Sequence, residues 1–350
     1  IFLSIMRKTV SSEGGADSFS NVSEGTKMQI SRWMKTAAVA AMVSAALTGC
    51  GEDKKAEAPK TIGIVQLVEH DALDAANRGI TDALKERGVT MEIDRQNAQA
   101  DQSNLRNIAQ RFVSHNYPLI FAIATPAAQT VANATSTTPI VATAVTDFAV
   151  AKLVKDNAKP GTNVTGSSDM NPIAAQTELL LKLVPNAKTV GTIYNSSEIN
   201  SQLQIDILRK ELEKHGVALA EATISSVNDI QQAAQSLVGK VDVMYVPTDN
   251  VVASSMPTLY RVTQAAKLAV VAGEAGMVKS GATATVAVDY YNLGKIAGNM
   301  GADILEGKAK PQDMPIRYQT EFNVVLNEPI VKELGLTVPE DVAKNVTWVK

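Results

Sequence analysis

Hydroxyl, amide and carboxyl side chains recur in this sequence where a short apolar segment ends and a helix-length segment begins. Few lysines or arginines accompany them, so the chemistry they offer is hydrogen bonding and negative charge. In chain order, the residues that we expect to contact a small ligand are Gln66, Glu69, His70, Thr125, Ala127, Thr146, Asp147, Phe148, Asn195, Ser196, Ser197, Asp249, Asn250 and Asp289. Glu274 follows a further apolar segment in the same way.

These residue types suit a ligand that carries both charges. Thr125 is predicted to be the N-cap of a helix with Pro126 at its first position, and free N–H groups there favour a carboxylate. Residues 195–197 repeat this arrangement later in the chain. The carboxylates that can face an ammonium group are Asp147, Asp249 and Asp289. An amino acid fits this combination, although Thr125, Ser196 and Asp147 acting only as helix caps is an open alternative.

Catalytic patterns are missing from the sequence. His115 and His215 fall near predicted helix ends, whereas His70 follows the first strand and is placed to line a cleft. We find no GxSxG, HExxH or Walker-type motif and no GxGxxG spacing. Cys50 is the only cysteine, which excludes an internal disulfide and a CxxC site. We therefore expect no enzyme activity, no catalytic residues, no cofactor and no metal.

The elements that must position these residues alternate between strand and helix. Residues 61–67 form a nearly continuous apolar run, as in a strand buried on both faces of a parallel sheet. The first series of such units ends with a short helix predicted over 148–156, and a second series starts after Pro172 and includes a helix over 251–267. This alternation predicts an α/β fold of two similarly built lobes with parallel sheets. Ligands bind such sheets beyond the carboxyl ends of the strands.

The last part of the chain is predicted to cross between the lobes. A helix over 290–306 should return to the first lobe, and the tail from about Thr320 should belong to the second. The predicted boundaries are 61–170 plus 289–319 for lobe 1, and 171–288 plus 320–350 for lobe 2. This discontinuity would produce a hinge with several crossing strands.

The sequence before residue 61 has the pattern of an export signal. A basic stretch at 27–35 and an uncharged apolar run at 36–48 precede Leu47-Thr48-Gly49-Cys50, which resembles a bacterial lipobox. We expect cleavage before Cys50, a diacylglycerol on its thiol with palmitate among the acyl chains, and a polar tether over 50–60. Residues 1–49 would be the signal peptide and an upstream segment, with translation starting at Met28 or Met34. The mature protein would be held to a membrane, in the periplasm or at the cell surface.

The composition limits the partners. The net charge is −3, with 20% charged and 45% hydrophobic residues, and no basic block or basic–aromatic stripe appears. Nucleic acid is therefore excluded as a partner. We expect a monomer.

Several segments together resemble the tryptophan/tyrosine-type substrate-binding proteins of ABC transporters. They are TIGIVQLVEH (61–70), ALD (72–74), IATPAAQ (123–129), TAVTD (143–147), NVTG (163–166) and DYY (289–291). The resemblance runs from about Lys60 to the C-terminus. It implies the type I periplasmic-binding fold, in which two Rossmann-like lobes with parallel sheets are joined by a three-crossover hinge. It also implies an amino acid ligand such as Trp, Phe or Tyr, and an ABC permease as partner.

Two positions depart from the usual pattern of this family. Asp71 and Phe148 stand where proline commonly follows His and Thr-Asp. Phe148 either stacks on an aromatic ligand or packs its own helix, and Tyr194 and Phe121 are the other candidate rings. Two alternatives for function remain: a sensor that presents its closed form to a membrane receptor, and binding of another small solute.

Overall fold

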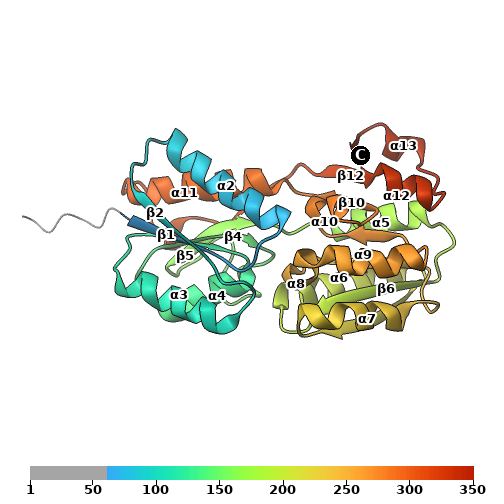
Figure 1. Cartoon of the computed structure of the whole chain (residues 1–350). Helices are drawn as coiled ribbons and strands as arrows, with labels where there is room; N and C mark the ends of the chain where they lie inside the picture. Colours follow the sequence, from blue (N-terminus) through green and yellow to red (C-terminus); the bar gives the residue numbers. More distant parts are fainter. Residues whose placement is uncertain (1–60) are drawn as a thin grey trace, which may run out of the picture. The chain divides into compact units, whose positions relative to one another are not determined.

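A computed structural model describes residues 61–350. The predicted signal, lipobox cysteine and tether lie outside this range. Within it, no helix combines the length and the apolar character needed to cross a bilayer. The described chain forms two lobes, each built on one sheet with helices packed against it (Figure 1).

Lobe 1 contains a six-stranded, wholly parallel sheet in the order β11-β5-β4-β3-β1-β2. Its strands are β1 (Thr61–Gln66), β2 (Glu92–Asn97), β3 (Ile120–Ile123), β4 (Ile140–Val145), β5 (Val164–Ser168) and β11 (Arg317–Tyr318). Its helices are α2 (Asp71–Glu86), α3 (Gln102–Ser114), α4 (Thr125–Ala134), α11 (Tyr290–Leu305) and the 3-10 turn η2 (Pro311–Asp313).

Lobe 2 contains a seven-stranded sheet in the order β13-β12-β10-β9-β8-β6-β7, parallel except where β12 meets β10. Its strands are β6 (Thr189–Asn195), β7 (Ala218–Ile224), β8 (Val243–Val246), β9 (Val270–Ala272), β10 (Ala284–Ala287), β12 (Asn323–Asn327) and β13 (Val346–Val349). Its helical segments are α5 (Ile173–Leu183), α6 (Ile199–Lys214), η1 (Val227–Asp229), α7 (Ile230–Leu237), α8 (Asn250–Ser254), α9 (Met256–Ala265), α10 (Ala275–Lys279), α12 (Glu328–Glu333) and α13 (Glu340–Ala343).

The two sheets share one doubly wound strand order. Counted within each lobe, β2-β1-β3-β4-β5 and β7-β6-β8-β9-β10 both follow the order 2-1-3-4-5. In such a sheet the strand order reverses between the first and third strands, and ligands bind at the carboxyl ends there. The fold class predicted from the sequence is confirmed. The strand order also predicts that a ligand site is formed by the loops after β1, β3, β6 and β8.

Three chain segments connect the lobes, and side chains tie these segments together. They run from β5 to α5, from β10 to α11 and from β11 to β12. The Val288 amide donates to Asn171 Oδ1 at 3.0 Å, and the Gln319 side chain both accepts from and donates to the Asp289 backbone, at 3.2 and 2.7 Å. The crossovers therefore form a cross-linked hinge.

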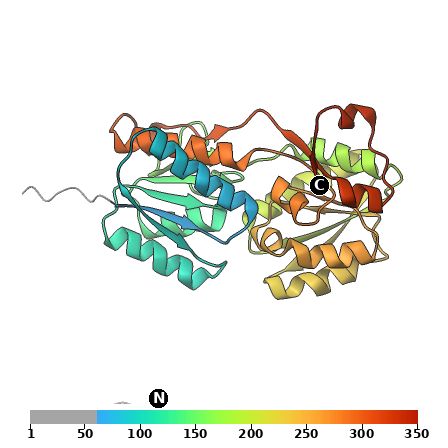
Figure 2. The ribbon, with the colours of Figure 1, turned by 45° about the horizontal axis from the view of Figure 1, so that its top comes forward.

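Helix α11, which returns to lobe 1 after the second crossover, packs against α2 with close backbone contact (Figure 2). A Cβ added to Gly79 would lie 2.1 Å from the Tyr291 carbonyl oxygen, and one added to Gly294 would lie 2.0 Å from the Ala76 carbonyl oxygen. Only glycine allows this approach, so a helix more than 200 residues away in sequence completes the lobe 1 core.

Two predicted helices are wrong. Residues 148–156 form turns, because Lys152 has a φ of 60° and ends the first turn in the left-handed region. The helix predicted over 251–267 is divided at Ser255 into α8 and α9. Pro257 explains the break, since it lacks the N–H that a continuous helix would need at that position.

Candidate functional site

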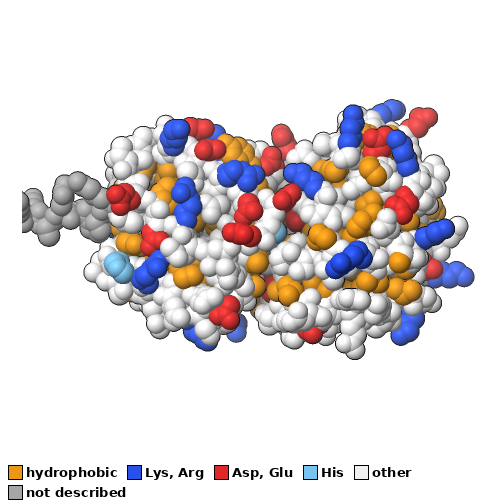
Figure 3. All heavy atoms as spheres, in the orientation of Figure 1, with side chains coloured by type: hydrophobic (Ala, Val, Ile, Leu, Met, Phe, Trp, Pro, Cys, Tyr) orange, Lys and Arg blue, Asp and Glu red, His pale blue; other side chains and the backbone are white. Residues whose placement is uncertain are grey.

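The lobes meet around a narrow cavity that both of them line. Its volume is about 10 Å³, room for about one water molecule. Lobe 1 contributes His70, Leu73, Ala144, Thr146, Asp169 and Tyr290, and lobe 2 contributes Asn200, Thr248, Asp249, Asn250, Ala253, Glu274 and Met277. No lysine or arginine lines it. Figure 3 shows acidic side chains on both sides of the groove between the lobes.

On the lobe 1 side, Asp169 follows β5 and is buried among hydroxyl groups. The Tyr290 hydroxyl donates to Asp169 Oδ2 at 2.6 Å, and the Thr146 hydroxyl donates to Oδ1 at 3.1 Å. Burial raises the pKa of Asp169 above its ordinary value. A positive charge beside this carboxyl would reverse that shift.

On the lobe 2 side, Asp249 and Glu198 both bind the start of α8. Asp249 accepts hydrogen bonds from the Asn195 and Val252 amides at 2.7 and 3.0 Å, and from the Ser201 hydroxyl at 2.7 Å. Glu198 accepts from the Asn250 side chain at 2.6 Å. Burial, and then the neighbouring Asp249, raise the pKa of Glu198 to about 8. This pair forms the centre of a buried polar network.

Glu274 adds a third lobe 2 carboxyl at the start of α10. It accepts from the Gly276 and Met277 amides, the latter at 2.8 Å, and burial raises its pKa to about 7. No salt bridge between described residues includes Asp169, Glu198, Asp249 or Glu274. The interlobe region thus holds four buried carboxyls, none of which forms a salt bridge with a described lysine or arginine.

His70 makes the polar contact across the cleft. Its Nε2 lies 3.5 Å from Asn250 Oδ1, while the Asn250 amide nitrogen is committed to Glu198. This arrangement assigns the proton to Nε2 and leaves Nδ1 as an acceptor. Burial lowers the pKa of His70 to about 4, so the ring is neutral at pH 7.

The cleft edge of lobe 1 carries two alanines in the left-handed region. Ala124, before α4, has a φ of 88°, and Ala144, at the irregularity in β4 between Thr143 and Val145, has a φ of 55°. Such conformations cost an L-residue about 1–3 kcal/mol and cluster at binding sites. Ala144 lines the cavity.

Five of the residues that the sequence places at strand ends line this cavity together: His70, Thr146, Asp249, Asn250 and Glu274. Others have different roles. Gln66 is buried and bonds Val68, Asp74 and Asn77 within lobe 1. Asp289 caps α11 by accepting from the Asn292 amide at 3.1 Å, and it belongs to the hinge.

The remaining predicted residues lie around the cavity or away from it. Asn195 accepts from the amide and hydroxyl of Ser197 at 3.0 and 2.8 Å. Glu69 and Ser196 are exposed, and Asp147 caps the turn that follows it through the Val150 amide. These residues do not line the cavity.

The start of α4 differs by one residue from the prediction. Ala124 is the N-cap, and Thr125 is the first helical residue with no capping bond. The prediction that Thr125 caps the helix is therefore wrong. Its hydroxyl is instead a buried group without a partner, and Ala127 is buried behind it. The helix starts one residue earlier than predicted because Ala124 has a positive φ, a conformation that its residue type does not predict.

The rings proposed for stacking do not line the cavity. Phe148 and Phe121 are fully buried in the lobe 1 core. The Tyr194 hydroxyl donates to Glu221 at 3.0 Å on the β6–β7 side of lobe 2. The structure favours the alternative in which Phe148 packs within its lobe. The apolar residues that do face the cavity include Leu73 and Met277.

Strand-end reasoning missed several lining residues: Asp169, Asn200, Thr248 and Tyr290. Asp169 follows β5, whose sequence VTGSS is too polar to be recognised as a buried strand. Tyr290 stood in the DYY segment and was detectable there. Asn200 lies inside the first turn of α6, where only the fold shows which way it faces.

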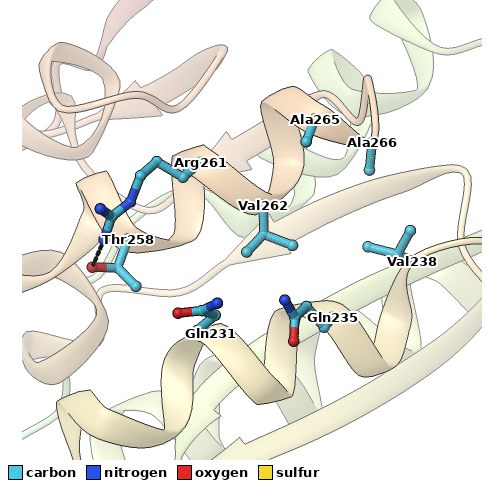
Figure 4. Close-up of a pocket in the computed structure, with 8 residues that line it drawn as sticks. All are labelled: Gln231, Gln235, Val238, Thr258, Arg261, Val262, Ala265 and Ala266. Carbon is cyan, nitrogen blue, oxygen red and sulfur yellow. Dashed lines mark hydrogen bonds between the residues drawn. The ribbon is translucent and has the colours of Figure 1, made fainter.

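Wider hollows lie elsewhere on the described surface. One of about 630 Å³ lies along helix α4 and is also lined by Ser197 of lobe 2. Another, of about 560 Å³, lies between α7 and α9, where Arg261 donates to the Thr258 hydroxyl at 3.3 Å (Figure 4). The latter is formed by two helices of one lobe rather than by strand ends. The interlobe cavity brings together strand-end residues of both lobes, and it is the candidate site for that reason.

Comparisons with known proteins agree with this architecture. The model of the family "ABC transporter substrate binding protein" matches residues 61–350. The tyrosine-binding protein of Clostridioides difficile is 43% identical over 319 residues, covering 87% of this chain and 92% of the relative. A Rickettsia prowazekii protein described as uncharacterised is 28% identical over 77% of this chain and 83% of its own length.

Two solved structures extend the comparison. An ABC domain from Streptococcus pneumoniae in complex with L-Trp is 40% identical, with a TM-score of 0.80 over 83% of this chain and 100% of that one. A ligand-free, open substrate-binding protein with adhesive properties from Clostridium difficile is 44% identical over 83% of this chain and 99% of that one, with a TM-score of 0.64. At similar identity, the TM-score is higher for the L-Trp complex than for the open structure. This chain belongs to the ABC transporter substrate-binding protein family.

Proposed function

We propose that this protein binds an aromatic amino acid between its two lobes and delivers it to the permease of an ABC importer. The observation that carries the proposal is the cavity lined by both lobes, in which buried carboxyls have no basic partner in the described chain. The L-Trp and L-Tyr named for the relatives support the aromatic side chain. The family role is delivery of a substrate rather than catalysis.

Each end of an amino acid finds matching groups, either in the cavity or at the end of β3, the strand between β1 and β4. The ammonium group suits the acidic cavity. The carboxylate suits the start of α4, where the first N–H groups lack helical partners and the Thr125 hydroxyl is buried without a bond. Leu73 and Met277 offer apolar contact, and a methionine sulfur interacts favourably with aromatic rings.

Binding requires the lobes to separate. A cavity of about 10 Å³ cannot admit an amino acid, so ligand would enter an open form and stabilise the closed one. We propose that 61–170 plus 289–319 and 171–288 plus 320–350 move as two bodies about the hinge. The closed form of the monomer would then dock on the permease.

Calorimetry with L-Trp, L-Tyr and L-Phe tests the proposal, with L-Leu as the aliphatic control. We expect at least one aromatic ligand to bind in the micromolar range or tighter, and L-Leu much more weakly. Small-angle scattering should show a more compact protein with that ligand. Binding no tighter than millimolar by all three would refute the aromatic assignment.

We propose further that Cys50 carries the lipid that holds the exported protein to a membrane. The support is the LTGC sequence after an apolar run. Cys50→Ala should move the protein from the membrane fraction to the soluble extract of cells. Retention of the variant in the membrane fraction would count against the anchor.

A further inference from the structure

The interlobe cavity contains acceptor atoms that nothing in the described chain satisfies. Among the buried polar atoms without a partner, two belong to residues that line it: Asn200 Oδ1 from lobe 2 and His70 Nδ1 from lobe 1. Such atoms are costly to bury unless a donor reaches them. Both are acceptors, so the missing group is a donor.

The orientation of the Asn200 amide is fixed by its neighbours. Its nitrogen donates to Glu198 Oε2 at 2.9 Å and to the Thr248 carbonyl at 3.1 Å. A flipped amide would place an oxygen against these two acceptors, which is unfavourable. Asn200 is 4% exposed, so Oδ1 is held as a buried acceptor at the cavity.

The cavity carboxyls differ in how far their bonding capacity is used. Asp249 and Glu274 accept from backbone N–H groups at the starts of α8 and α10, which favour negative charge. Asp169 accepts only from the hydroxyls of Tyr290 and Thr146. A carboxylate has about four acceptor positions, so Asp169 has room for further donors.

We propose that these groups form an amine subsite: Asp169 supplies negative charge, and Asn200 Oδ1 and His70 Nδ1 accept hydrogen bonds from the ligand's ammonium group. This inference rests on the proposed function and deepens it. An ammonium group has three N–H donors, and the acceptors come from both lobes. The amine therefore favours the closed form, and the protein selects ligands by their amine more than by their carboxylate.

Three ligands that share an indole ring test this selection. L-Trp carries both charges, tryptamine lacks the carboxylate, and indole-3-propionate lacks the amine. Charge-assisted hydrogen bonds predict that losing the amine weakens affinity about 100-fold or more, and that losing the carboxylate weakens it less. If L-Tyr is the tighter ligand, tyramine and 3-(4-hydroxyphenyl)propionate replace the indole analogues.

Substitutions test which residues cause the preference for the amine. Asp169→Asn keeps the side-chain shape and should weaken L-Trp about 100-fold without weakening indole-3-propionate, and Asn200→Ala should weaken L-Trp about tenfold with the same selectivity. Thr192→Val is the matched control, because Thr192 also has a buried hydroxyl without a partner but does not line the cavity. A loosened fold would weaken both ligands equally, so their ratio separates the two causes.

The outcomes distinguish this inference from the proposed function. If the amino acid and its amine-free analogue bind within about threefold of each other, the amine subsite is wrong while the amino acid role stands. If both variants keep the wild-type ratio, these residues do not form the subsite. If no amino acid binds, the proposed function and the inference both fail.

Discussion

The two lobes share a strand order, yet they treat polar groups at the cleft in opposite ways. In lobe 2, Asp249 and Glu198 are saturated with hydrogen bonds that join α6 to the β8–α8 loop. In lobe 1, the Thr125 hydroxyl and His70 Nδ1 have no partner, and Ala124 and Ala144 hold left-handed backbone. The Asp249–Glu198 side of lobe 2 is therefore preformed, with Asn200 Oδ1 as its unpartnered acceptor at the cavity, and lobe 1 holds most of the remaining unused hydrogen-bonding capacity.

Residues that follow corresponding strands in the two sheets therefore have different roles. Thr125 and Asp249 follow the third strand of their respective sheets, β3 and β8. Thr125 has a buried hydroxyl without a hydrogen-bond partner, whereas Asp249 caps helix α8. Substitutions in the saturated Asp249–Glu198 network should therefore change mainly stability, and those at unpartnered groups mainly affinity.

The largest expected effect is on the stability of lobe 2. Asp249→Ala leaves two buried backbone N–H groups and a hydroxyl without an acceptor, so the free energy of unfolding should fall by about 3 kcal/mol in urea denaturation. Asp289→Ala removes a half-buried cap from the hinge and should cost about 1 kcal/mol. Equal losses would show that the lobe 2 network adds no special stability.

The pH dependence of stability should reveal the same network. The folded pKa of Glu198, about 8, lies above its ordinary 4.5. Between these values the folded state holds a proton that the unfolded state has lost, so stability falls as pH rises. From pH 6.5 to 8.5 the ligand-free protein should lose about 1–2 kcal/mol.

Two details make that measurement specific. His70, with a folded pKa of about 4 and an ordinary value of 6.5, changes stability in the opposite direction, mainly below this pH range. Glu198→Gln should flatten the slope. A slope unchanged by this substitution would assign the effect to other groups, such as Glu274.

In lobe 1, Thr125 should matter for affinity rather than stability. Thr125→Val removes a hydroxyl that has no partner, so the melting temperature should not fall. Loss of one hydrogen bond to the ligand carboxylate should weaken L-Trp about tenfold in calorimetry. Thr125→Ser keeps the hydroxyl and should retain affinity; equal weakening in both variants would indicate a packing effect.

The smallest effect is expected for the ion pair that joins the lobes at the surface. Lys279 Nζ lies 4.0 Å from Asp71 Oδ2, and both side chains are more than half exposed. Exposed pairs contribute little, so Lys279→Ala should change ligand affinity less than about twofold. A larger change would mean that direct contact between lobes, rather than ligand, controls closure.

Much of the fold and part of the site could be predicted from the sequence. The apolar run of β1 and the alternation of strands and helices were sufficient for two parallel sheets. His70, Thr146, Asp249 and Asn250 were found because carboxyl ends of parallel strands meet at one edge. These features depend on local pattern and on one rule of sheet geometry.

Other features depend on contacts between distant segments. Strand β5 is polar, and it can be buried only because its hydroxyls bond the Met314, Leu293 and Thr146 carbonyls. Phe148 became a core residue because lobe 1 packs around it, and the helix predicted there ends at Lys152.

The sequence by itself determined which residues lie at strand ends, because periodicity and turn residues are local properties of the chain. Only the tertiary structure decided which of them still have unused hydrogen-bonding capacity. Asp169 and Tyr290 meet because α11 returns to lobe 1 after more than 100 residues. Whether a polar group has its hydrogen bonds satisfied depends on all of its neighbours in space. Those neighbours are set by the crossovers and by the glycine contact between α2 and α11.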